Sequence, residues 1–414
     1  MIFRLLFVCL FCFHVLHADA IHADKGIVEK EYSAIWLTWL HDPTSTMTIS
    51  WLAPALKEAA STSLAFHKKG EASPWKEMEV ELSSLPEDVE AAMGSTELTN
   101  LESNTEYEFR IGAHGEVFGL KTAPSDILKP LSFVIGGDVM PGDPALFEDT
   151  CKKAAAYQPS FVVFGGDLAY SAPDKKSKKE DFPRWTKWFQ IIFETLRIDN
   201  QLIPIVTAIG NHEVKGGFGQ TREEAPFFYT FFRKPYLDGY MACRFNNYLS
   251  LYLLDSGHTN SISGAQAEWL ENQLKRDRKS LHRIAIYHVP AYPSVRYFKN
   301  ETSSKIRKHW APLFDKYRLN MAFENHDHAY KRTFPLRGGE IDPRGVVYIG
   351  DGSWGVHPRV PRKASSTDFL AKTESARQFA LVTISEEERL VTIISSEGKS
   401  VDKVVQLVED ETQK

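Results

Sequence analysis

Six short apolar runs in this 414-residue chain are each followed by a polar or glycine-rich cluster, and this pattern constrains the fold more than any other sequence feature. Apolar runs rich in β-branched residues indicate buried strands, and the turn residues after them indicate strand ends. The clusters are Gly-Gly-Asp138, Gly-Gly-Asp167 with Tyr170, Gly-Asn211-His212-Glu213, His288, Asn325-His326-Asp327-His328 and the glycine-rich segment after Val346. Because ligands of open α/β sheets bind beyond the carboxyl ends of the strands, we expect the clusters to converge.

The first five clusters together predict a site for two metal ions, since Asp, Tyr, Asn and His are metal-ligating side chains. Hydrolysis of a phosphate ester requires that negative charge be shielded and that water become a strong nucleophile. Two ions about 3.5–4 Å apart do both. A bridging carboxylate would hold the pair together, and carboxylate, imidazole and amide oxygen would complete each shell.

The order and spacing of these clusters resemble the calcineurin-like metallophosphoesterase superfamily and, within it, the purple acid phosphatase family. Tyr170 distinguishes the purple acid phosphatase pattern from that of most other superfamily members. Most superfamily members carry a His two residues after the first Asp, where this chain has Met140, and here a Tyr three residues after the second Asp takes its place. The resemblance extends over residues 28–408 and implies an α/β catalytic domain built as a four-layer α/β/β/α sandwich, preceded by an all-β sandwich similar to fibronectin type III.

The resemblance also implies roles for individual residues. The first metal, normally Fe(III), would be held by Asp138, Asp167, Tyr170 and His328. The second, Fe(II), Zn or Mn, would be held by Asn211, His288 and His326, with Asp167 bridging. A metal-bound hydroxide would attack the phosphorus of a phosphate monoester, and His212 would be the catalytic residue that helps the leaving oxygen depart. Glu213 is expected to orient a ligand histidine.

The chain departs from the family pattern at three places. Met140 replaces a usual Gly and is expected to narrow the mouth beside the first metal, and Asn325 replaces a Gly before His326. A further His that family members carry after the fourth ligand segment is missing, so Arg296 or Tyr297 is expected to contact phosphate instead. The expected substrate-binding residues are therefore Asn211, His212 and Arg296. These differences put substrate preference in doubt and leave the reaction class intact.

Two domains are expected. Residues 28–122 show about seven short strand patterns, which suggests a β-sandwich. The strands are predicted at Ala34–Leu40, Thr46–Trp51, Thr62–Lys68, Trp75–Glu81, Val89–Leu98, Glu106–Ala113 and Val117–Thr122. Tyr107 would cap a corner of this module. Residues 131–408 alternate strands with helical patterns at Ala145–Tyr157, Trp185–Leu196 and Gln266–Leu274, which predicts an α/β domain. Three last strands, Gln378–Ile384, Leu390–Ser396 and Val401–Val408, are expected at its edge.

The first 20 residues have the features of a signal peptide: Arg4, an apolar core and the small residues Ala18 and Ala20 before the cut. We therefore expect export to the periplasm, the exterior or an endomembrane lumen, with no transmembrane anchor after cleavage. Cys151 and Cys243 then remain, either as one disulfide or as two buried thiols. A net charge of −5 indicates no nucleic-acid surface. The expected partner is a small-molecule phosphate ester, and a homodimer is compatible with the sequence.

Two other functions are weighed against the phosphatase. A phosphodiesterase or nucleotide-cleaving enzyme could use the same metals, because ester preference lies in loops such as residues 174–181 and 295–302. A cell-surface binding protein acting through residues 28–122 would predict a degenerate metal set, which the intact set opposes. His258 and Asp351 are interpreted as packing and turn residues, Asp255 as a buttress of the site, and the charged run from Pro173 to Asp181 as a solvated loop.

Overall fold

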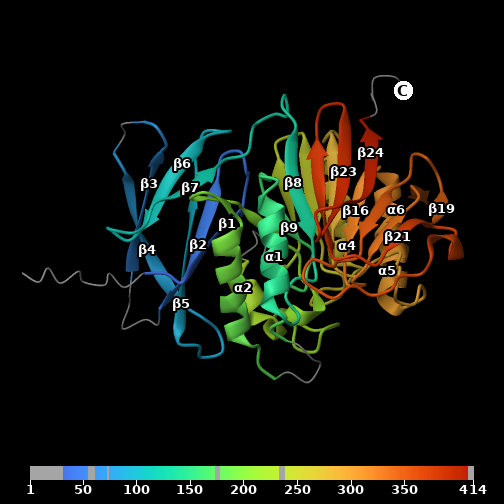
Figure 1. The fold of residues 1–414 in the computed structure, drawn as a ribbon, viewed down its shortest axis with the longest axis horizontal. Coiled ribbons are helices and arrows are strands. Elements are labelled where there is room, and N and C mark those ends of the chain that lie inside the picture. Colours follow the sequence, from blue (N-terminus) through green and yellow to red (C-terminus); the bar gives the residue numbers. More distant parts are fainter. Residues whose placement is uncertain (1–30, 55–60, 72–73, 173–177, 233–237, 409–414) are drawn as a thin grey trace, which may run out of the picture. The chain divides into compact units, whose positions relative to one another are not determined.

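The computed structural model of the chain describes residues 31–54, 61–71, 74–172, 178–232 and 238–408 (Figure 1). The signal peptide predicted for residues 1–20 lies outside these ranges, and so do residues 173–177 of the charged loop. No helix among the described residues is long and apolar enough to cross a membrane.

All seven strands predicted for the N-terminal domain are present. They are β1 (Ala34–Thr38), β2 (Met47–Pro54), β3 (Ser61–Lys68), β4 (Lys76–Ser84), β5 (Ala91–Leu98), β6 (Glu106–Ile111) and β7 (Phe118–Lys121). The first part of β4 pairs with β3, and its last residues pair with β5. β4 therefore passes from one sheet of the sandwich to the other. In β6, Tyr107, Phe109 and Ile111 are buried and alternate with less buried residues, which is the period-2 pattern of a half-buried strand.

Tyr107 closes a corner of this sandwich, as the sequence predicted. Its ring is buried, and its hydroxyl oxygen accepts a 2.9 Å hydrogen bond from the backbone N–H of Glu102. A Tyr that bonds back to the chain a few residues upstream is the tyrosine corner of β-sandwiches. The likeness to fibronectin type III in particular stays a prediction.

Two sheets form the core of the catalytic domain. The first has the order β12 (Ile205–Thr207), β9 (Val162–Phe164), β8 (Leu131–Gly136), β22 (Gln378–Ile384), β23 (Glu388–Ser395) and β24 (Ser400–Leu407). The second has the order β13 (Met241–Phe245), β14 (Leu249–Leu253), β15 (His282–Ile286), β16 (Met321–Glu324), β20 (Val347–Gly350), β17 (Tyr330–Thr333) and β21 (Leu370–Glu374). Short hairpins are formed by β10 (Arg197–Ile198) with β11 (Gln201–Leu202) and by β18 (Leu336–Arg337) with β19 (Glu340–Ile341).

Helices cover the outer faces of both sheets (Figure 1). They are α1 (Pro144–Ala155), α2 (Phe182–Thr195), α3 (Pro226–Phe231), α4 (Ala265–Arg276), α5 (Glu301–His309) and α6 (Ala311–Lys316). Ile284 and Ile286 of β15 face the cluster between the sheets, whereas Ala285 faces the cluster under α4, α5 and α6. Phe133 and Val134 of β8 divide in the same way between the inner cluster and the α1–α2 side. The predicted four-layer α/β/β/α fold class is therefore confirmed.

The six apolar runs recognised in the sequence all form strands. Three of them, β8, β9 and β12, are parallel neighbours in the first sheet. The other three, β15, β16 and β20, are parallel neighbours in the second. Parallel neighbours end at the same sheet edge, so the polar segments that follow each set of strands are brought together.

One placement was wrong. The last three strands were expected at the edge of the domain, but β22 lies inside the first sheet, antiparallel to β8 on one side and to β23 on the other. Only β24 is at the edge among them. Strand order depends on long-range pairing, which a local apolar pattern does not specify.

The two domains share apolar surface through β1 and α2. The ring of Trp36 on β1 stacks on Phe189 of α2 at 3.9 Å, and both are buried. Trp185 and Trp188 are fully buried on the same helix. Of the two alternatives for the cysteines, buried thiols are observed, with Cys151 on α1 and Cys243 on β13.

We predict that Tyr107→Phe lowers the free energy of unfolding by about 1–2 kcal/mol, because the Glu102 N–H loses its acceptor in a partly buried corner. Denaturant unfolding of the variant measures this loss. Tyr157→Phe, which removes a hydroxyl from a 40% exposed ring, is the control and should change stability by less than about 0.5 kcal/mol. Equal free energies of unfolding for the two variants would show that the hydrogen bond of the Tyr107 hydroxyl does not stabilise the fold.

Candidate metal centre

Many of the predicted ligands lie on left-handed backbone. Asp138, Asp167, Tyr170, His326 and His328 have φ angles from 53° to 75°. Such angles are uncommon outside glycine, and they cost free energy that the surrounding structure must offset. Each of these residues follows one of the parallel strands, so the turn directs its side chain across the end of the sheet. Strained backbone concentrated in this way favours a functional site.

Asn325 explains why two of the turns need glycine. Its buried side chain donates to the Tyr287 carbonyl at 2.9 Å and lies between the turns that precede Asp138 and Asp167. A Cβ on Gly137 would meet Asn325 Oδ1 at 2.5 Å, and one on Gly165 would meet Nδ2 at 2.0 Å. The Asn that departs from the family pattern thus packs the two glycine turns together.

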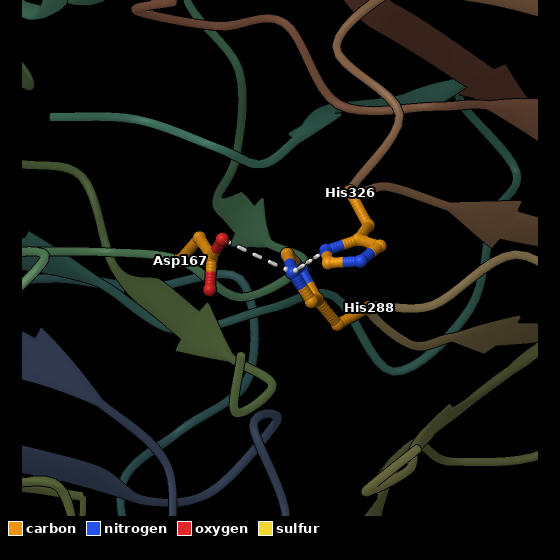
Figure 2. A group of neighbouring side chains, drawn as sticks. All are labelled: Asp167, His288 and His326. Carbon is orange, nitrogen blue, oxygen red and sulfur yellow. Dashed lines mark hydrogen bonds and ion pairs between the residues drawn. The ribbon is translucent and has the colours of Figure 1, made fainter. Parts of the chain in front are cut away.

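One group of donor atoms gathers around His288. Its Nε2 lies 3.1 Å from Asp167 Oδ2 and 3.0 Å from His326 Nδ1 (Figure 2). The same nitrogen lies 3.2 Å from Asn211 Oδ1. Its Nδ1 faces the Gly165 carbonyl oxygen at 3.1 Å, which fixes the ring and leaves Nε2 directed at the group. Asp167, His288 and His326 are buried and could hold a metal ion together.

A second group gathers around Asp138. Its Oδ1 lies 2.9 Å from His328 Nε2 and 3.5 Å from the Tyr170 hydroxyl, while its Oδ2 accepts from the His326 backbone N–H at 2.7 Å. Asp138, Asp167 and His328 form a further set of side chains that could hold an ion. Asp167 therefore belongs to both sets, which is the arrangement that a bridging carboxylate requires.

Charge is unbalanced at this centre. Asp138 and Asp167 are buried, and among the described residues their ion pairs are with histidines, not with Lys or Arg. Burial raises the pKa of Asp167, but the charges of His288 and His212 outweigh it and hold the pKa well below its usual value. Burial lowers the pKa of His288, yet Asp167 and Asp138 raise it to about 9. The carboxylates thus draw positive charge to the place where the donor atoms meet.

Glu213 has a role other than the predicted one. It was expected to orient a ligand histidine, but its Oε2 accepts from the backbone N–H groups of Asp167 and Gly210, each at 2.9 Å, and its Oε1 from Leu168 at 2.6 Å. Burial, followed by the charge of Asp167, raises the pKa of Glu213 to about 8. Glu213 therefore holds the Asp167 turn against the turn before Asn211.

His212 lies at the edge of the centre. Its ring stacks on Tyr170 with 4.3 Å between centroids, and its side chain is 28% exposed. Nδ1 faces the Ala172 carbonyl oxygen at 3.2 Å, and the backbone N–H donates to Asp167 Oδ1 at 2.9 Å. Among the described residues, Nε2 has no partner closer than Asp167 Oδ2, which lies 4.0 Å away. This nitrogen is available to a molecule that enters the site.

The structure changes what was expected near the mouth. Met140 is buried in the cluster under α1 and α2, so the prediction that it narrows the mouth is wrong. Arg296 Nη1 is already engaged by Asp327 at 3.0 Å and by the His326 carbonyl, which leaves its other N–H groups for a ligand. Tyr297 is 68% exposed.

His258 was interpreted as a packing residue and lies beside the centre instead. Its buried ring is 5.5 Å from that of His288, and Nδ1 faces the Gly217 carbonyl oxygen at 3.0 Å. Burial lowers its pKa to about 4. Asp255 supports it, as expected of a buttress, by accepting from the His258 N–H at 2.7 Å.

A buried charged network lies next to the His326–His328 turn. Lys331 forms ion pairs with Glu324 and, at 3.5 Å, with Asp351. The Asp351 carbonyl accepts from the His328 N–H at 2.7 Å, and its carboxylate accepts from Ser294. Asp351 is therefore a fully buried support of the turn, not the simple turn residue expected. An alternating strand pattern gave no sign that Lys331 faces inward.

Glu180 was included in the charged loop after Tyr170 and is buried. Its Oε2 accepts from Ser171 and from Trp185 Nε1 at 2.9 Å, and Oε1 accepts from the Phe227 N–H at 3.4 Å. Burial raises its pKa to about 7. Glu180 thus fastens the segment that follows Tyr170, and the solvated-loop interpretation does not hold for this residue.

Comparison with known protein families gives two matches that together cover most of the described chain. Residues 33–124 match the purple acid phosphatase N-terminal domain, and residues 131–330 match the calcineurin-like phosphoesterase domain. Purple acid phosphatase 18 of Arabidopsis thaliana is 26% identical over 272 residues, which cover 64% of this chain and 58% of that protein. An uncharacterized protein of Mycobacterium tuberculosis is 27% identical over 289 residues, 60% of this chain and 52% of its own length. The matched region thus spans a little over half of these relatives.

Solved structures share the fold. A purple acid phosphatase from yellow lupin (Lupinus luteus) seeds superposes with a TM-score of 0.71 at 16% identity, covering 90% of this chain and 73% of its own. PhoD superposes with a TM-score of 0.68 at 11% identity, covering 92% and 93%. Identity this low supports the architecture alone.

We predict that Glu180→Gln flattens the pH dependence of stability. The pKa of Glu180 rises from 4.5 to about 7 on folding, so its proton stabilises the fold below pH 4.5 and this contribution is lost as pH rises through 7. A shift of this size corresponds to about 3 kcal/mol. Denaturant unfolding at pH 5 and pH 8 should show the wild type losing more stability than the variant. Glu386→Gln, at an exposed carboxyl, is the control. If Glu180→Gln loses as much stability between pH 5 and pH 8 as the wild type does, the assignment of this pH dependence to Glu180 is contradicted.

Proposed function

The chain belongs to the purple acid phosphatase family of calcineurin-like phosphoesterases, and from this premise we propose that it is an acid phosphatase that hydrolyses phosphate monoesters at a pair of metal ions. The observation that carries the proposal is the position of Asp167, which is shared by two sets of side chains able to hold an ion. The proposed substrate is a small-molecule phosphate ester.

The residues of the centre fit two ions in charge and in spacing. Ligand atoms about 2.0–2.2 Å from an ion lie roughly 3 Å apart when they are at right angles around it. The donor atoms around His288 are 3.0–3.2 Å from its Nε2, and His328 Nε2 is 2.9 Å from Asp138. Cations would also balance two buried carboxylates that Lys and Arg do not neutralise.

We assign the ligands in two sets. The first ion, Fe(III), would be held by Asp138, Asp167, Tyr170 and His328. The second, Fe(II), Zn or Mn, would be held by Asp167, Asn211, His288 and His326. Phenolate is a hard oxygen donor, which suits Fe(III) at the site that contains Tyr170. A bound metal pair shields the charge of a phosphate and makes water a stronger nucleophile.

His212 is the proposed catalytic acid. With Nδ1 held by the Ala172 carbonyl, its Nε2 can carry a proton toward the site, where it would protonate the oxygen that leaves phosphorus. Stacking on Tyr170 and the backbone bond to Asp167 fix the ring. Asn211, His212 and the N–H groups of Arg296 that remain available would bind the phosphate oxygens.

Export is proposed from the sequence of residues 1–20, which lie outside the described part of the chain. The periplasm, the exterior and an endomembrane lumen all agree with that proposal, and a homodimer is compatible with it.

We predict that metal-loaded protein hydrolyses p-nitrophenyl phosphate faster than bis-p-nitrophenyl phosphate, and best in acid. Asp167→Asn should lower kcat/KM by about 1,000-fold or more and reduce bound metal, because both ions lose a ligand. Side-by-side rates from pH 4 to pH 8, with elemental analysis of each preparation, measure both effects. Asp368→Asn, at an exposed carboxylate, is the matched control.

The outcomes separate the alternatives. A faster diester rate would replace the monoester assignment with a phosphodiesterase on the same metals. Full activity in Asp167→Asn would refute the bridging role. Hydrolysis of neither substrate by wild type that contains metal would favour a binding protein that acts through its N-terminal sandwich.

A further inference from the structure

A cavity of about 1120 Å³ lies at the sheet edge opposite the metal centre. Its wall includes residues just before the parallel strands β15, β16 and β20, among them Arg278, Arg318 and Arg344. The proposed ligands His288 and His326 follow the first two of these strands, so a full strand length separates the cavity from the metal centre. Residues of β23 and β24 in the first sheet complete the wall.

The wall of this cavity carries far more positive than negative charge. Seven arginines and one lysine line it, against two glutamates. Arg332 pairs with Asp402 at 2.7 Å. Arg337 and Arg344 share a single carboxylate, that of Asp342, at 3.2 and 4.0 Å. When these two aspartates are counted with the two glutamates, the carboxylates amount to half the number of cations.

Three of the cations have side chains that are open to a ligand. Arg278, Lys279 and Arg318 are exposed, and within the described ranges their side chains have no hydrogen-bond or ion-pair partner. A guanidinium can form two parallel hydrogen bonds with a phosphate or sulfate group, and an ammonium adds a point charge. The donors needed to bind an anion are therefore present at the mouth of the cavity.

Two further arginines are fixed in the wall. Arg283 is buried, and its Nη1 donates to the Tyr317 carbonyl at 2.8 Å. Arg389 is also buried, and its Nη2 donates to the Leu281 carbonyl at 2.7 Å, which joins β23 to the segment before β15. The adjacent His282 senses this charge, because burial, followed by the charge of Arg389, lowers its pKa to about 3. Positive charge on walls of low dielectric concentrates the field inside the cavity.

We propose that this cavity is a second binding site for a compact polyanion that carries several phosphate or sulfate groups. Both groups are tetrahedral oxyanions that arginine binds in the same way. A cavity of about 1120 Å³ is as large as pockets that enclose drug-sized molecules, so one ligand can contact several of the cations at once. None of the proposed metal ligands lines the cavity. The inference therefore goes beyond the phosphatase function and does not depend on it.

The test uses pyrenetetrasulfonate, a fluorescent polyanion that contains no ester bond. Its Kd is measured by fluorescence titration with metal-loaded wild type, Lys279→Gln/Arg318→Gln and Lys187→Gln/Lys308→Gln. The first double variant removes two exposed cations of the cavity whose side chains have no partner to lose among the described residues. The second is the matched control, because it removes the same charge from exposed positions of α2 and α5 that do not line the cavity. Asp167→Asn tests binding at the metal centre.

We expect Lys279→Gln/Arg318→Gln to raise the Kd of pyrenetetrasulfonate by about tenfold, because two charged contacts are lost. Added salt should raise the Kd of wild type, since the attraction is between charges. The control double variant and Asp167→Asn should match wild type within about twofold.

Wild type that does not bind the probe, or a Kd raised equally by both double variants, would overturn the inference. So would a Kd raised by Asp167→Asn, because the probe would then lie at the metal centre. Displacement of the bound probe by tripolyphosphate or by sucrose octasulfate would support the site and identify phosphate or sulfate as the group that it takes. Displacement by neither compound would contradict the proposed ligand class.

Discussion

The structure of the centre depends on one buried carboxylate, that of Asp167. Its oxygens face His288 on one side and the His212 backbone on the other, and its turn has a left-handed φ of 53°. Three backbone N–H groups bound to Glu213 hold that turn in place. Carboxylate oxygens of Asp138 and Asp167 lie within 4.8 Å of each other, and two buried negative groups at such a distance would repel, so the arrangement favours positive charge between the donor atoms. The donor atoms of the remaining site residues surround the place where this positive charge is favoured.

Support for the centre comes from both domains. Glu87, between β4 and β5 of the N-terminal sandwich, accepts from the Glu180 backbone N–H and pairs with Lys215 at 3.0 Å. Glu180 in turn fastens the segment after Tyr170. Trp36 stacked on Phe189 adds apolar contact between the same two domains. The sandwich therefore contributes to the stability of the loops beside the centre, although its own strands carry none of the proposed ligands.

The sequence was sufficient where the signal is local. Strands such as β8 and β15 are recognisable as apolar runs, and the proposed ligands follow them within a few residues, so the strand-end rule predicts which side chains meet. The sequence did not reveal the roles of residues and strands that depend on tertiary packing. Glu213 bonds to backbone rather than to a histidine, Asp351 is buried through Lys331, and β22 is interior because it pairs with β8 across more than 200 residues of sequence. Each depends on a partner that is distant in the chain.

The number of metal ions bound tightly by one chain tests the central claim most directly. Elemental analysis of protein purified after exposure to iron and zinc, with protein quantified by amino-acid analysis, measures it. A centre built on a shared Asp167 predicts two ions per chain, because each set of donor atoms is complete only with that carboxylate. A stoichiometry of one or none would show that the two sets do not act as a binuclear site and would contradict the account.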